Sequence, residues 1–168
     1  MGTEPQMFIR RASRSDLETV YAITQRTIAE AYPQYYPSGV VSFFAEYHSR
    51  KALGTDIEQG CVLIAEADGV AVGTGTVANG NYITRVYVLA EHQGNGYGAR
   101  IIDELERAVA QTHDSATLDA SDGAYEMWLR RGYVTEKHTT EDANDGCKLS
   151  YYTMRKRLET VPNGAEEI

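Results

Sequence analysis

The chain has 168 residues, a formal net charge of −8, and 42% hydrophobic and 24% charged residues, which is ordinary for a single globular domain with its own core. The acidic balance argues against a nucleic-acid partner, because no basic stripe is present to neutralise phosphates. No apolar run approaches the roughly 18 residues of a membrane span, and residues 1–6 do not resemble a signal peptide. Cys61 and Cys147 lack the spacing of metal ligands, so we expect no metal. With no membrane span and no signal peptide predicted, we expect a cytoplasmic protein that does not associate with membranes.

In chain order, the first half predicts a strand, two helices and three antiparallel strands. A capping box over residues 13–16 begins the first helix, and Pro33 and Pro37 interrupt a tyrosine-rich stretch. Asp68-Gly69 and Asn79-Gly80 are favoured turn pairs, and each should join two strands. The expected strands cover residues 8–12, 61–67, 70–77 and 83–88, and the second helix contains Phe43, Phe44, Tyr47 and Leu53.

The second half predicts a helix, a short strand, another helix and two strands. Ser121 or Asp122 begins the second of these helices, and Gly132 ends it. The order of elements predicts one α/β (α+β) domain over residues 1–168, with a mixed, mostly antiparallel sheet and helices on both faces. Its core spans about residues 8–158, and the tails 1–6 and 160–168 are expected to fray. The expected strands cover residues 116–120, 133–135 and 149–154, and the first helix places Ile101, Ile102, Leu105, Ala108 and Val109 on one face.

The most informative segment carries glycine at positions 94, 96 and 98, between a β-branched strand and an amphipathic helix. Glycine lets the backbone approach a ligand closely, and a helix start presents free N–H groups with a partial positive charge. Together they predict an anion site, most simply one for phosphates. A flexible turn with no ligand is the alternative, although three alternate glycines cost chain entropy.

A dinucleotide fold is one interpretation of this loop. Gly94-x-Gly96-x-x-Ala99 fits its fingerprint, and Asp119 lies where a ribose-binding acid is sought. Two observations oppose it. Residues 89–93 separate the strand from the first glycine, and two hairpins precede the motif where the fold requires an opening βαβ unit.

A second interpretation covers the whole chain. Gln93-x-x-Gly96-x-Gly98 resembles the pyrophosphate loop of the GNAT N-acetyltransferase superfamily, whose pattern is Gln/Arg-x-x-Gly-x-Gly/Ala. Residues 119–124 and 128–133 resemble that family's second signature, and the element order agrees from residue 8 to about 158. The resemblance implies a sheet splayed between two central parallel strands, residues 83–88 and 116–120, with acetyl-CoA lying in the split.

The same resemblance implies acetyl transfer from acetyl-CoA to a primary amine of a small molecule or peptide, by direct attack without a covalent enzyme intermediate. Backbone groups of Val86 and Val88 would pair with pantetheine, and amides from Gln93 to Ala99 would cradle the pyrophosphate. The resemblance also allows a homodimer. The expected residues of the CoA site are Val86, Tyr87, Val88, Gln93, Gly94, Asn95, Gly96, Tyr97, Gly98, Ala99, Ser121 and Trp128.

The proton chemistry departs from the family pattern. Many members carry a tyrosine as general acid where this chain has Trp128, and an indole N–H donates a hydrogen bond but cannot supply a proton. Tyr82 stands nearest the position where one branch of the family has a glutamate base, and it is no base at neutral pH. The remaining catalytic candidates are Tyr125, Glu66 and Asp119. A non-catalytic acyl-CoA-binding or regulatory module is therefore the rival function.

The resemblance also implies that acceptor specificity comes from the first two helices and the last hairpin loop. One hypothesis is that an aromatic wall and an acidic rim receive a small cationic amine; the alternative is a packed aromatic core beside a solvated loop. The loop is expected to cover residues 136–145, with Glu136, Glu141, Asp142 and Asp145. The substrate candidates are Tyr32, Tyr36, Tyr82 and Arg85.

Overall fold

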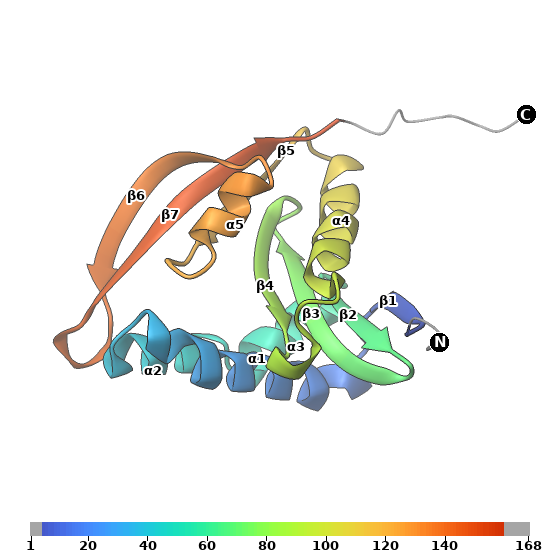
Figure 1. Cartoon of the computed structure of the whole chain (residues 1–168), viewed down its shortest axis with the longest axis horizontal. Coiled ribbons are helices and arrows are strands. Elements are labelled where there is room, and N and C mark those ends of the chain that lie inside the picture. Colours follow the sequence, from blue (N-terminus) through green and yellow to red (C-terminus); the bar gives the residue numbers. More distant parts are fainter. Residues whose placement is uncertain (1–4, 160–168) are drawn as a thin grey trace, which may run out of the picture.

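A computed structural model describes residues 5–159, which fold around a mixed sheet in the strand order β1-β2-β3-β4-β5-β7-β6 (Figure 1). Residues 1–4 and 160–168, which include most of both predicted tails, lie outside the described part. The strands are β1 (Met7–Arg11), β2 (Val62–Ala67), β3 (Val70–Ala78), β4 (Tyr82–Val88), β5 (Ser115–Ala120), β6 (Val134–Asp142) and β7 (Lys148–Arg157). The α-helices are α1 (Leu17–Ala31), α2 (Ser38–Tyr47), α3 (Arg50–Glu58), α4 (Tyr97–Ala110) and α5 (Tyr125–Arg130).

Two tight hairpins build the first half of the sheet. Asp68 and Gly69 have φ of 50° and 80°, and Asn79 and Gly80 have φ of 52° and 82°. Positive φ at both central residues is the geometry that matches the twist of paired strands. Both predicted hairpins are therefore confirmed, and they order β2, β3 and β4 as antiparallel neighbours.

The sheet opens between β4 and β5, the parallel pair among the described strands. These two strands are in register at one position, Tyr82 opposite Thr117, where the Thr117 amide also donates to the Asn81 carbonyl at 2.9 Å. Beyond this point they diverge, and the β6–β7 hairpin swings away from the first half with α5 between the two (Figure 1). The predicted splayed sheet is confirmed.

Helices cover both faces of the first half, as predicted. Helix α4 lies on one face, with Ile101, Leu105 and Val109 almost fully buried, and α1, α2 and α3 lie on the other (Figure 1). A Cβ at Gly75 of β3 would come within 2.7 Å of Ile101, so glycine at that position lets α4 sit close to the sheet. In the described part of the chain, no helix combines the length and apolarity needed to cross a membrane.

Three predicted boundaries are wrong. The single second helix is two helices, α2 and α3, because Ser49 breaks the run and caps α3 by accepting from the Ala52 amide at 3.2 Å. Helix α5 begins at Tyr125 rather than at Ser121 or Asp122, and the Ser121 carbonyl instead closes a turn. The predicted loop over residues 136–145 is mostly strand, since β6 continues to Asp142.

The ends of the described chain are fixed by the sheet. Gln6 is predicted to lie in the N-terminal tail, but its backbone is bonded to the β2–β3 turn. The Gln6 amide donates to the Asp68 carboxylate at 3.1 Å, and the Asp68 amide donates to the Gln6 carbonyl at 3.0 Å. Strand β7 pairs with β5 on one side and β6 on the other. A dimer formed through the second half of the sheet would therefore use the edge strand β6.

Candidate active site

The glycine loop between β4 and α4 is a preformed cradle. Gly94 and Gly96 have φ of 82° and 81°, in the left-handed region where the backbone of any residue with a Cβ is strained. A Cβ at either position would meet nothing within 4 Å. The Gln93 side chain donates to the Val88 carbonyl at 2.9 Å, and the Asn95 side chain donates to the His92 carbonyl at 3.0 Å. Because side chains hold the loop from within, the first amides of α4 remain free to face an anion.

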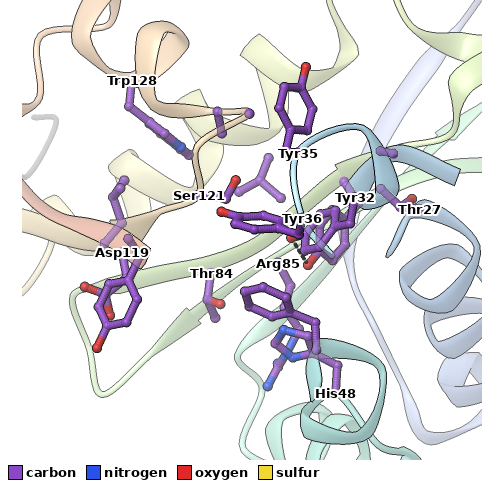
Figure 2. A pocket seen from close by; sticks show the side chains of 18 of the residues that line it. Thr27, Tyr32, Tyr35, Tyr36, His48, Thr84, Arg85, Asp119, Ser121 and Trp128 are labelled. Atoms are coloured by element: carbon purple, nitrogen blue, oxygen red, sulfur yellow. Dashed lines mark hydrogen bonds between the residues drawn. The ribbon is translucent and has the colours of Figure 1, made fainter. Parts of the chain in front are cut away.

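A cavity of about 500 Å³ lies where β4 and β5 diverge, closed on its other side by α2 and the segment that joins α1 to α2 (Figure 2). Gln93, which begins the glycine loop, also lines the cavity, so the loop starts at the edge of the cavity. Gly94 to Ala99 do not line the cavity. The predicted site residues that do line it are Tyr32, Tyr36, Tyr82, Arg85, Val86, Tyr87, Val88, Gln93, Asp119, Ser121 and Trp128.

Aromatic side chains from α2 and from the segment that joins α1 to α2 form one wall of the cavity. The Tyr32 and Tyr87 hydroxyls lie 3.0 Å apart, and the Phe44 ring meets the Tyr32 ring edge-on at 5.0 Å. The Tyr36 hydroxyl accepts from the Asp122 amide at 2.8 Å, which ties this wall to the turn after β5. Burial raises the pKa of Tyr36 to about 12, so its hydroxyl stays neutral at physiological pH.

A carboxylate faces the cavity at the point where the strands begin to separate. Asp119 accepts hydrogen bonds from the Tyr82 hydroxyl at 2.9 Å and from the Thr153 hydroxyl at 2.6 Å. Burial and the neighbouring Asp119 raise the pKa of Tyr82, which therefore remains a donor. These two bonds fix the carboxylate and leave it further acceptor capacity toward the cavity.

Arg85 holds a second polar cluster at the wall near α2. Its φ is +51°, which is unusual for a non-glycine residue in a strand, and its side chain forms an ion pair with the partly buried Asp56 carboxylate. Its Nε donates to Nδ1 of His48 at 2.8 Å. Burial, reinforced by Arg85, lowers the pKa of His48 to about 3. His48 and Asp56 escaped the sequence analysis because they belong to no motif and meet Arg85 only in the folded chain.

Two catalytic candidates lie away from the cavity lining. The Tyr125 hydroxyl is 2.8 Å from the Thr135 hydroxyl, and its ring stacks on Tyr152 at 4.0 Å. Glu66 pairs with Arg10 at 2.8 Å between β1 and β2. Of the three candidates, the structure brings Asp119 alone to the cavity.

Trp128 and Ser121 line the side of the cavity formed by α5 and the turn that precedes it (Figure 2). Trp128 is buried and meets Tyr133 edge-on at 5.0 Å, so its position is set by core packing. Among the residues that the structure describes, no group of three or more His, Cys, Asp or Glu side chains could hold a metal ion.

A sheet that opens between two parallel strands, with a glycine cradle and a helix start at the open end, defines an acetyltransferase-type site. The model of the acetyltransferase (GNAT) domain matches residues 31–158, about three-quarters of the chain. The chain therefore belongs to the GNAT acetyltransferase family. No curated protein sequence gives a significant match.

Solved structures agree with the family assignment. One is a GCN5-related N-acetyltransferase, also described as an aminotransferase of class II, from Rhodopseudomonas palustris, with 27% identity, a TM-score of 0.83 and coverage of 94% of this chain and 99% of that one. PaiA N-acetyltransferase from Thermoplasma acidophilum, in complex with coenzyme A, has 18% identity, a TM-score of 0.69 and coverage of 91% and 99%. YncA from Salmonella typhimurium, a putative acetyltransferase with its cofactor acetyl-CoA, has 17% identity, a TM-score of 0.67 and coverage of 96% and 99%.

Proposed function

We propose that this protein transfers the acetyl group of acetyl-CoA to a primary amine of a small molecule or peptide. The observation that carries the proposal is that the glycine loop begins at Gln93, which also lines the cavity. A ligand with a phosphate-bearing end and a long acyl arm fits that shape. The relatives from Thermoplasma and Salmonella, which hold coenzyme A and acetyl-CoA, support this choice of ligand.

The residues present fit such a ligand from end to end. Amides from Gln93 to Ala99 would hold the pyrophosphate without lysines, which suits a chain of net charge −8. Beyond its contact with β5 at Tyr82, β4 has no strand partner on that side, so Val86 and the Val88 amide can offer backbone groups to an extended arm, while the Val88 carbonyl accepts from Gln93. When bound, the thioester supplies the acetyl group, and a fixed backbone N–H aimed at its carbonyl would stabilise developing charge.

We propose that Asp119 binds the incoming amine and accepts its proton. An incoming ammonium group must lose a proton before its nitrogen can attack, and a fixed carboxylate both attracts the cation and offers an acceptor for that proton. Tyr82 and Thr153 hold Asp119 in place by donating to it. No covalent intermediate on the enzyme is required.

The leaving thiolate receives no proton from a side chain in this proposal. Trp128 can donate a hydrogen bond but no proton, and the Tyr125 hydroxyl is engaged with Thr135 outside the cavity lining. Solvent would therefore protonate the thiolate after it departs. This departure from the family pattern is why a non-catalytic acyl-CoA-binding module remains the rival function.

The test is release of free thiol from acetyl-CoA with a panel of primary amines, together with binding titrations of coenzyme A and NAD. We expect coenzyme A to bind, NAD not to bind, and at least one amine to accelerate thiol release. Asp119→Asn should lower kcat/KM for that amine by about 100-fold or more, the low end of general acid–base effects. Asp114→Asn, a change in the turn before β5, is the matched control. Tight coenzyme A binding with no turnover on any amine would establish the module instead, and NAD binding would restore the dinucleotide interpretation.

A further inference from the structure

His48, at the C-terminal end of α2, is held more firmly than a packed side chain requires. The Gln25 side chain donates to its backbone carbonyl at 3.0 Å, and its ring stacks against Phe44 with 6.3 Å between centroids and 9° between planes. Tyr47 meets the same ring edge-on at 5.1 Å. Arg85, whose backbone is held at a φ of +51°, aims its Nε at the ring. Backbone, ring face and one ring nitrogen are thus all fixed.

These contacts determine which nitrogen of the His48 ring carries the proton. Arginine is always a donor, so Nδ1 must accept the Arg85 N–H. A neutral imidazole with an accepting Nδ1 carries its proton on Nε2. The lowered pKa of about 3 keeps the ring neutral at physiological pH. Nε2–H is therefore a permanent donor and His48 cannot act as a base.

The free Nε2–H faces the cavity. His48 is 5% exposed and lines the cavity wall, as Figure 2 shows beside Arg85. Nε2 makes no hydrogen bond to a described residue, yet no fully buried side-chain N or O atom among those residues lacks a partner. Nε2 must therefore reach open space, and the cavity is the space that His48 lines.

We propose that His48 is a specificity-determining residue that donates Nε2–H to a neutral carbonyl oxygen of the acceptor amine. The proposal rests on the proposed N-acetyltransferase function and narrows its substrates to amines that also carry an amide-type carbonyl, such as an amino-acid amide or a peptide N-terminus. A hydrogen-bond donor in a desolvated wall raises the affinity for a substrate with a matching acceptor and lowers the affinity for a substrate that leaves the donor unpaired.

The charges around the cavity favour a neutral carbonyl over a carboxylate. Asp56 neutralises Arg85, so the cluster offers no net positive charge to an anion. Asp119 and Glu141 are the other charged side chains that line the cavity, and both are acidic. A substrate carboxylate would be repelled, whereas an ammonium group with an uncharged carbonyl suits both the acids and the donor.

The test compares three acceptors with the same side chain: an amino-acid amide, a short peptide that begins with the same residue, and the corresponding amine that lacks the carbonyl. The free amino acid is a fourth arm. For the wild type, we expect kcat/KM for the amide or the peptide, calculated on the unprotonated amine in each case, to exceed that of the amine by about tenfold, the effect of one hydrogen bond. The amide and peptide arms distinguish a small-molecule from a peptide source of the carbonyl.

His48→Phe keeps an aromatic ring against Phe44 and removes the donor. It should reduce the amide-to-amine ratio to about one, mainly by raising KM for the amide. His48→Gln, which retains a side-chain N–H, should recover part of the ratio and serves if His48→Phe fails to fold. A ratio unchanged in His48→Phe, or a wild type that prefers the amine or the free amino acid, would overturn the proposal.

A spectroscopic arm separates this inference from the proposed function. Side-chain ¹⁵N NMR of the wild type should show a neutral His48 ring protonated at Nε2, and the amino-acid amide should shift that resonance more than the amine does. If no amine is turned over, the proposed transfer fails, and the Nε2 shift still decides whether His48 binds a carbonyl. No shift with the amide overturns the inference.

Discussion

At the scale of single residues, the site depends on backbone conformations that ordinary side chains resist. Gly94 and Gly96 adopt positive φ with empty space where a side chain would stand. Glycine adopts this region without steric cost, so the loop turns its amides outward at no strain.

Gly96→Ala should weaken acetyl-CoA binding. The new methyl group would extend into the cradle and strain the backbone by about 1–2 kcal/mol. We expect KM for acetyl-CoA to rise by about tenfold, because a hydrogen bond to a charged group contributes about 1.5 kcal/mol or more. Steady-state kinetics with acetyl-CoA as the varied substrate measures this change.

Gly69→Ala is the matched control for that substitution. Gly69 has nearly the same φ, 80°, and the same empty surroundings, but it lies in the β2–β3 turn. Both variants should lose similar stability in urea, while Gly69→Ala leaves KM for acetyl-CoA unchanged. Equal KM values in the two variants would show that the glycine loop does not hold the phosphates.

At the scale of elements, an ionic cluster joins the start of the chain to the sheet. Arg10 of β1 pairs with Glu66 of β2 and, through both terminal nitrogens, with Asp16 ahead of α1. The Asp16 carboxylate also accepts from the Ser13 amide at 2.7 Å, which closes the predicted capping box. Hydrogen bonds from Arg10 lower the pKa of Asp16 well below its ordinary 3.8.

This cluster predicts a pH dependence of stability. A carboxyl whose pKa is lower in the folded state stabilises the fold above its ordinary pKa and loses that contribution as the pH falls toward the folded value. Asp16→Asn should therefore reduce the free energy of unfolding at pH 7, and the deficit should shrink at pH 3. Urea denaturation at the two pH values measures the difference.

Glu58→Gln is the control for Asp16→Asn. Glu58 pairs with Arg14 on an exposed surface, with 57% and 84% of the two side chains exposed, and such pairs contribute little. Glu58→Gln should show no comparable loss of the free energy of unfolding at pH 7. A pH-independent deficit in Asp16→Asn would mean that packing, rather than charge, holds this corner of the fold.

Elements governed by local chemistry could be predicted, and those governed by distant partners could not. The hairpins depend on Asp68-Gly69 and Asn79-Gly80, whose turn preferences are intrinsic to the dipeptides. Strand β6 was largely missed because it is mostly exposed and shows no apolar alternation, so its pairing with β7 alone defines it.

The same division runs through the candidate site. The glycine loop is contiguous and could be read from the sequence, whereas His48, Asp56 and Arg85 come from three elements and meet only after folding. Asp119 was one of three carboxylate or tyrosine candidates. The sequence offered no means to separate it from Glu66, since the side of the sheet to which each belongs depends on the strand order.

At the scale of the whole molecule, the sheet is two halves joined weakly at its centre. Strands β1 to β4 form one half and β5, β7 and β6 the other, with Tyr82 opposite Thr117 as their register contact. The Tyr36 hydroxyl, bonded to the Asp122 amide, adds a bridge across the opening. A ligand that fills the split would contact both halves, so binding and stability should be coupled.

Coenzyme A should therefore raise the unfolding temperature. At a concentration of 100 times its Kd, a ligand that binds only the folded state contributes about 2.7 kcal/mol. For a domain of 168 residues, roughly 2–4 °C per kcal/mol predicts a rise of about 5–10 °C. Hydrogen exchange should slow most at residues 84–88 and 94–99, because these backbone groups would bind the ligand, and least in β1.

NAD at the same concentration is the control. A rise with NAD and none with coenzyme A would contradict the acetyltransferase assignment of the cradle, and the absence of added protection at residues 84–88 and 94–99 would mean that the ligand does not bind in the split.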